Sequence, residues 1–350
     1  VVLDEVPYLA GSTAGFASIV QAVWDHLARP SKLMLILSGS AFGSIETMLG
    51  PRGPLRGRPT LSTRLDPISL REARAFLPKL GPTEFVQAYA ACGGYPLHLQ
   101  AWDERSGLDA NLMRLAMTPG GILLEDAQGI LREELPDVGG YTRILAAIGC
   151  GRSRYSQIAS AAEQRIEHPL DVLAHAAFIR QARPLGAPKA ATPLYELADV
   201  YLAFWFGVLY SDIPQIEAGQ GRQVLARIKD AFQKQLGAVF EAAAREHAQR
   251  LVQSGGLPAN LVIGRWWTTR GGSCEVDVLG LRGNEVQLLG EAKWQAKPMT
   301  AQDLALFRRK TEAVPNRTPD PLLVLWARGG VEPKVKQLGA LGFSLEEMLA

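Results

Sequence analysis

The sequence predicts an α/β protein, and three of its segments carry that prediction. Short apolar runs at residues 1–3 and 33–37 flank a segment of helical spacing at 16–27, which is the order of a parallel sheet. Residues 274–294 form two runs of alternating apolar and polar side chains around a glycine-containing turn, which predicts a β-hairpin. Helical patterns fill residues 69–134, so we expect a helical middle region between two sheets.

Composition and charge limit the class of protein. The chain has 350 residues with 47% hydrophobic and 21% charged side chains, which predicts a soluble globular protein of one to three domains. A formal net charge of +2 excludes a strong overall attraction to nucleic acid or membranes. The three cysteines lack disulfide or metal spacing and no signal-peptide pattern occurs, so we expect a cytoplasmic protein. The most apolar run, residues 201–210, is too short to span a bilayer.

The hairpin at residues 274–294 contains the strongest candidate site. Side chains repeat every second residue along a strand, so Asp277 shares a face with Glu275, and Glu291 with Lys293. Pairing of the strands would bring Asp277, Glu291 and Lys293 together, with both carboxylates on one side. Carboxylates suit Mg²⁺, and a neighbouring lysine suits a developing phosphate charge. A surface hairpin with solvated charges is the alternative interpretation.

A second group of polar residues follows the two N-terminal apolar runs. Asp4 and Glu5 end the first run, in the pattern of a Walker B strand. In that pattern Asp4 would hold Mg²⁺ through water and Glu5 would orient the attacking water, which makes Glu5 a candidate catalytic residue. Ser38 and Ser40 follow the second run, at the position that senses the γ-phosphate.

Two arginines extend this N-terminal pattern. Arg56 and Arg58 are further candidate nucleotide-binding residues, and a short strand is expected near residues 60–65. A phosphate loop of the form G-x-x-x-x-G-K-[ST] is missing, and the sequence contains no Gly-Lys pair. The loop supplies most phosphate contacts, so we expect weak or no ATP binding by this chain and bound ATP only in a complete protein. We therefore expect a chain truncated before Walker B.

Residues 136–212 predict a winged-helix-like domain. Three helices are expected, at 141–148, 155–162 and 169–180, followed by a Pro-rich segment at 183–197 that would form the wing. The third helix is mostly apolar, with Arg180 as its only basic residue; the nearby basic residues are Arg152, Arg154 and Arg165. This is a weak electrostatic footprint for DNA, so DNA contact and a packing role both stay open.

Residues 202–210 contain four aromatic side chains in a continuous apolar run, which favours core packing over stacking on single-stranded nucleic acid. A linker is expected at 213–228. A long helix at 230–252 carries Glu241 within the pattern G-x-x-F-E. Helical geometry places Glu241 roughly opposite the apolar stripe, where pairing with Arg245 is the simpler alternative.

The chain resembles the archaeal-type AAA/STAND ATPases that carry a C-terminal nuclease-like domain, known as domain of unknown function 234, of the PD-(D/E)XK superfamily. The segments that carry the resemblance are VVLDEVPYL, LILSGS, LRGR, ACGGYPLHL, LADVYLAFWFGVLY, LGAVFEAAARE, WW, EVDVLG and GEAKW. It implies part of a P-loop ATPase core (1–68), a helical lid (69–135), a winged-helix-like domain (136–212), a linker (213–228) and a restriction-endonuclease-like α/β domain (229–350).

The resemblance also implies a function. Asp277 and Glu291 would hold Mg²⁺, Lys293 would stabilise the transition state, and Glu241 on the first helix would join the metal site. The complete protein would use ATP for Mg²⁺-dependent DNA processing or defence, with DNA as a candidate partner and the ATPase half as a candidate oligomerisation surface. A non-catalytic DNA-binding or assembly module is the alternative.

Overall fold

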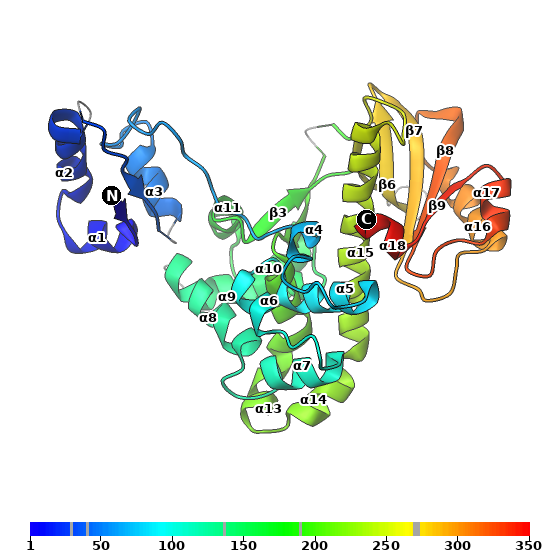
Figure 1. Cartoon of the computed structure of the whole chain (residues 1–350), viewed down its shortest axis with the longest axis horizontal. Helices are drawn as coiled ribbons and strands as arrows, with labels where there is room; N and C mark the ends of the chain where they lie inside the picture. Colours follow the sequence, from blue (N-terminus) through cyan, green and yellow to red (C-terminus); the bar gives the residue numbers. More distant parts are fainter. Residues whose placement is uncertain (29–30, 40–41, 136–137, 189–190, 269–273) are drawn as a thin grey trace.

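A computed structural model describes residues 1–28, 31–39, 42–135, 138–188, 191–268 and 274–350. Figure 1 shows a small N-terminal unit, a helical body and a C-terminal sheet, with one long helix between the body and the sheet. The chain is thus a mixed α/β protein with three sheets in its described part. In that part, no helix is both long and apolar enough to cross a membrane.

The N-terminal unit is built around a two-stranded parallel sheet. Its elements are β1 (Val2–Leu3), α1 (Val6–Ser12), α2 (Phe16–Val23), a π-helix (Trp24–Ala28), β2 (Ile36–Leu37) and α3 (Phe42–Leu49). Its small core is separate from the rest and consists of Val6, Val20, Met48 and Leu55. The strand expected near residues 60–65 is absent: this segment is exposed and has no regular structure, because it packs against no neighbour that would pair it.

The helical body begins with five helices, in agreement with the pattern at residues 69–134. They are α4 (Leu70–Ala73), α5 (Pro82–Cys92), α6 (Pro96–Ala101), α7 (Leu108–Leu115) and α8 (Ile122–Glu134). Gly93 ends α5 with a φ of 61°. A Cβ there would lie 2.8 Å from the backbone nitrogen of Tyr201, so only glycine fits this contact.

Three more helices and a two-stranded antiparallel hairpin follow. They are α9 (Val138–Gly149), α10 (Tyr155–Ala162), α11 (Glu167–His175), β3 (Ile179–Ala182) and β4 (Leu194–Leu197). The expected third helix ends earlier than predicted, since Ala177 takes a left-handed conformation with a φ of 57°. Arg180 consequently lies on β3 and not on a recognition helix.

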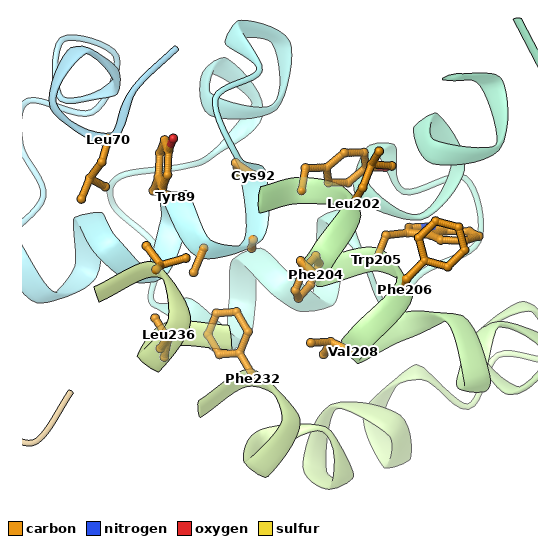
Figure 2. Close-up of a cluster of buried hydrophobic side chains, with 14 of the residues drawn as sticks. Leu70, Tyr89, Cys92, Leu202, Phe204, Trp205, Phe206, Val208, Phe232 and Leu236 are labelled. Atoms are coloured by element: carbon orange, nitrogen blue, oxygen red, sulfur yellow. The ribbon is translucent and has the colours of Figure 1, made fainter. Parts of the chain in front are cut away.

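The aromatic run is part of the core, as the sequence predicted. It forms α12 (Val200–Phe204), a π-helix (Trp205–Leu209) and a 3₁₀ turn (Tyr210–Asp212). Figure 2 shows Phe204 and Trp205 among other buried side chains, and the Trp205 Nε1–H donates to the Leu124 carbonyl at 2.8 Å. The segment expected as a linker instead forms α13 (Ile213–Glu217) and α14 (Gly221–Arg227), because Ile216 and Val224 are fully buried.

The C-terminal part is a five-stranded mixed sheet preceded by the 26-residue helix α15 (Lys229–Ser254). Its elements are β5 (Val262–Thr268), β6 (Cys274–Arg282), β7 (Glu285–Lys293), α16 (Ala301–Thr311), β8 (Arg317–Ala327), α17 (Pro333–Gln337), β9 (Leu341–Phe343) and α18 (Leu345–Leu349). The strand order is β5-β6-β7-β8-β9, antiparallel up to β7 and parallel from there on. From α15 to β8 the elements follow in the order α-β-β-β-α-β.

Helix α15 packs against both the helical body and the C-terminal sheet. Phe232 and Leu236 near its start lie in the core of the helical body, as Figure 2 shows. Phe240 and Ala244 further along pack in the same continuous core with sheet residues such as Trp326. Leu304 and Phe307 of α16 cover the other face of the sheet in a second core. The helical body and the sheet therefore share one buried interior.

Candidate functional site

The hairpin of β6 and β7 brings the predicted site residues to one end of the sheet. Val278 and Gly290 form the last pair of the antiparallel register, so Asp277 and Glu291 both lie just beyond it, at the same end of the hairpin. The charge of Glu291 acts on Asp277, so the two carboxylates lie within electrostatic range of each other.

A β-bulge re-aims Asp277. Gly264 of β5 pairs with Leu279 and Trp266 pairs with Val276, so two residues of β6 lie opposite Arg265 alone. A bulge of this kind disturbs the alternation of side chains and is common beside active sites. The expectation that the Asp277 and Glu291 carboxylates lie on one side of the sheet requires Val276 and Ala292 to share the other side. The bulge prevents this: Val276 is buried in the core under α16, and Ala292 in the core under α15.

Glu291 is the best-buried acid of the group, with 6% of its surface exposed. Its Oε2 lies 3.3 Å from the Lys293 ammonium, as the shared strand face predicts. Its Oε1 accepts a hydrogen bond from the Lys310 ammonium at 3.0 Å. Lys310 comes from α16, the helix that connects the parallel strands β7 and β8. Each oxygen of Glu291 is therefore paired with a lysine.

Asp277 is held by the neighbouring strand. The Ala292 backbone N–H donates to its Oδ2 at 2.9 Å. Burial raises the pKa of Asp277 to about 6; the hydrogen bond from Ala292 and the charge of Lys310 oppose this rise, and the charge of Glu291 adds to it. Asp277 thus lies within electrostatic range of both Glu291 and Lys310.

Glu241 on α15 lies near the same group. Burial, with a smaller contribution from the charge of Asp277, raises the pKa of Glu241 to about 7, while the charge of Arg245 opposes this rise. The Arg245 guanidinium also donates to the Asp277 backbone carbonyl at 3.0 Å. Arg245 thus influences Glu241 and also contacts the backbone of the candidate site, and the role of Glu241 toward a metal stays a prediction.

Trp294 follows Lys293 and has a packing role. Its ring lies 5.6 Å from the Phe240 ring, and the Arg328 guanidinium stacks over it at 4.7 Å. These contacts fix the end of β7 and hence the position of the Lys293 backbone.

Asp277 and Glu291 are the two carboxylates that could hold a magnesium ion here, if the ion kept most of its water. Mg²⁺ is commonly held by one or two carboxylates, with water and substrate phosphate completing six ligands. Asp277 and Glu291 supply two carboxylates, and Glu241 is within electrostatic range of Asp277. In the described ranges, no group of three His, Cys, Asp or Glu residues has the geometry of a metal site. A metal here would therefore rely on two carboxylates.

Two further residues of this site carry no spacing signal in the sequence pattern. Arg265 lies opposite the bulge, and Lys310 pairs with Glu291. No local spacing signals either contact, because each depends on a neighbouring strand or helix. The only available signal was the basic run that ends α16.

In the N-terminal unit, Asp4 lies beside Ser38. Strands β1 and β2 are parallel, so their carboxyl ends lie side by side. The Ser38 hydroxyl donates to Asp4 Oδ1 at 2.7 Å, and this hydrogen bond lowers the pKa of the Asp4 carboxyl. Glu5 follows with a left-handed φ of 51°. Ser40 lies outside the described residues.

Arg56 and Arg58 have partners within the N-terminal unit. Arg58 forms an ion pair with Asp25 at 2.7 Å, and Arg56 donates to the Pro51 carbonyl at 2.8 Å. Their predicted role toward a nucleotide stays a prediction.

Part of the chain, including the candidate site, is similar to a described family of domains. Residues 205–305 match the DUF234 family, described as archaea bacterial proteins of unknown function. The match includes Glu241, Asp277, Glu291 and Lys293 and ends before Lys310. The chain is also similar to the Uncharacterized protein MJECL04 of Methanocaldococcus jannaschii, at 28% identity over 307 residues, which is 84% of this chain and 67% of that protein.

Among solved structures, the chain is similar to the Walker-type ATPase paby2304 of Pyrococcus abyssi. The identity is 20% and the TM-score is 0.42, and the match covers 59% of this chain. The matched part spans 62% of the length of that ATPase chain.

Proposed function

We propose that the C-terminal domain hydrolyses phosphodiester bonds with the help of a divalent metal ion. The observation that carries this proposal is that Glu291, 3.3 Å from the Lys293 ammonium, lies within electrostatic range of Asp277 at the bulged end of the β6–β7 hairpin. Two acids at the end of a mixed sheet, with a lysine beside them, form the donor set that phosphoryl chemistry requires. DNA is the proposed substrate.

Each residue has a separate role in this proposal. Asp277 and Glu291 would hold the metal ion, which supplies an activated water and polarises the phosphate when it is bound. Lys293, with 41% of its side chain exposed, reaches solvent and would bind a phosphate oxygen as its charge develops. Glu241 lies within electrostatic range of Asp277 and would orient a bound water or accept a proton from it.

The test is a plasmid-nicking assay with the full chain in Mn²⁺, combined with a melting curve. We expect nicking that depends on Mn²⁺, and a rise of the melting temperature with Mn²⁺ concentration. Asp277→Ala removes both effects, whereas the matched change Asp320→Ala, at an exposed position of β8, keeps both. Nicking that survives Asp277→Ala would show that the activity comes from another site or a contaminant.

We further propose that the N-terminal unit is part of an ATPase core. The hydrogen bond between Ser38 and Asp4, across two parallel strands, supports a Walker B strand beside a sensor strand. Titration calorimetry with Mg-ATP tests the nucleotide site. Since the sequence contains no phosphate loop, we expect no micromolar binding by this chain. Micromolar affinity that Asp4→Ala abolishes would overturn this expectation.

A non-catalytic binding or assembly module is the second candidate function. The pairing of both Glu291 oxygens with lysines favours it, because those oxygens are then satisfied without a metal. This function predicts DNA binding that falls steeply with salt and is indifferent to Mn²⁺. Nicking dependent on Asp277 would exclude it as the sole function.

A further inference from the structure

Lys310 holds a central electrostatic position in the candidate site. Its ammonium donates to Glu291 Oε1 at 3.0 Å, and its charge also acts on Asp277 and Glu241. A single ammonium therefore interacts with all three acids that are candidate metal ligands. Lys293 pairs with Glu291 at the other oxygen.

The backbone of Lys310 is firmly positioned, although its side chain is long. Helix α16 begins with a capping box formed by Thr300 and Asp303 and is anchored by the buried Phe307. The Cys274 thiol, at the start of β6, donates to the Lys310 carbonyl at 3.3 Å. These contacts fix the Cα, while four rotatable bonds leave the ammonium free to change partners. About a third of the side chain is exposed, at 35%.

We propose that Lys310 is a built-in counter-ion that competes with the divalent metal for Glu291. This inference rests on the proposed function, because it concerns the same acids. Without a metal, the ammonium neutralises Glu291 and shields its two acidic neighbours. When a divalent ion binds, the ammonium leaves Glu291 Oε1 and turns toward solvent, where a substrate phosphate would approach.

The physical reason is the balance of charge in a half-buried site. Two close carboxylates repel each other and lose hydration, so an uncompensated pair destabilises the fold. One ammonium compensates them in part and keeps the empty site folded. The same ammonium opposes metal entry, because like charges repel and Glu291 Oε1 is already occupied.

The experiment compares Lys310→Met with the wild-type full chain by calorimetric titration of Mn²⁺ and by thermal melting. Methionine keeps the length and the packing of the lysine stem. We expect Lys310→Met to melt at a lower temperature without metal, to bind Mn²⁺ about tenfold more tightly, and to recover its stability when loaded. Arg309→Met, at the exposed neighbouring position, should change none of these quantities.

The variant Lys310→Arg is the control that separates the loss of charge from a general folding defect. It keeps the charge, so its metal affinity should stay near that of the wild type. If wild type binds Mn²⁺ in an Asp277-dependent way and Lys310→Met binds it no more tightly, the competition is refuted while the proposed function stands. If neither wild type nor Lys310→Met binds Mn²⁺, both the competition and the metal-dependent function are refuted.

Discussion

The Arg265 guanidinium and the Glu196 carboxylate form an ion pair that joins β5 of the C-terminal sheet to β4 of the preceding hairpin. Glu196 also binds Arg180 of β3 at 3.0 Å, so one acid serves two arginines. The Leu185 N–H, in the loop of that hairpin, donates to the Arg265 carbonyl at 2.8 Å. The hairpin thus contacts the edge strand of the sheet and occupies one of its backbone hydrogen-bonding groups. This contact favours the packing role of residues 136–212 over DNA contact through Arg180.

Glu196→Gln should therefore loosen the hairpin from the sheet. The two arginines would lose their shared charged partner while Arg265, 22% exposed, stays half-buried. We expect a loss of about 1–2 kcal/mol in the free energy of unfolding, measured by urea denaturation. The matched change Glu217→Gln, at an exposed position of α13, should have no effect. Equal stability of both variants would show that the ion pair contributes nothing.

Glu241→Gln should stabilise the metal-free protein in a pH-dependent way. The pKa of Glu241 is raised from 4.5 to about 7 by burial, so folding favours its protonated form. The stabilisation that protonated Glu241 gives the folded state is complete below the pKa of this group in the unfolded chain. It is lost as the pH rises through the folded-state pKa of about 7. At pH 8 the variant should exceed wild type by about 1–3 kcal/mol, and at pH 4 the two should agree.

Thermal melting at both pH values, without divalent metal, measures this difference. Glu312→Gln, at an exposed position after α16, serves as the control. An advantage of Glu241→Gln that is equal at pH 4 and pH 8 would contradict the assignment of a raised pKa.

His98→Ala should destabilise the helical body. His98 is fully buried, and its ring nitrogens lie 2.8 Å from Asp126 Oδ2 and 3.1 Å from the Cys92 carbonyl. Its ring also packs against Tyr201 at a centroid distance of 4.3 Å. Removing it leaves a cavity and two unpaired acceptors, so we expect a loss of about 2–4 kcal/mol. Urea denaturation measures it, with the exposed His168→Ala as control; equal stability would show that this network is dispensable.

Limited proteolysis should cut first between the N-terminal unit and the helical body. Residues 60–66 are exposed and lack helix or strand, whereas α4 begins with a capping box at Ser69. Arg64 lies in this segment, and its side-chain partner Asp66 is 75% exposed. Trypsin should therefore cleave after Arg64 and release a stable fragment that begins near residue 65. Mass spectrometry identifies the fragment. First cleavage within the sheet of residues 262–343 would contradict this order of stability.

Local sequence patterns were sufficient to predict many of the helices and strands. The helices of residues 69–134, the buried aromatic run at 202–210 and the β6–β7 hairpin were predicted, because each has a clear period, a cap or a turn signal. Pattern failed at residues 60–65, since a short run of strand-forming residues becomes a strand only beside a partner. It also failed at 213–228, where glycine and proline suggested a linker but buried isoleucine and valine fold two helices.

The sequence by itself determined that Glu291 and Lys293 share a strand face, because side chains alternate along every strand. Tertiary structure alone decided which residues surround them. The bulge that re-aims Asp277 depends on the register with β5, and the pairing of Lys310 with Glu291 depends on how α16 packs against the sheet. Such contacts join residues far apart in the chain, and no local period encodes them; they follow from the burial of apolar faces on both sides of one sheet.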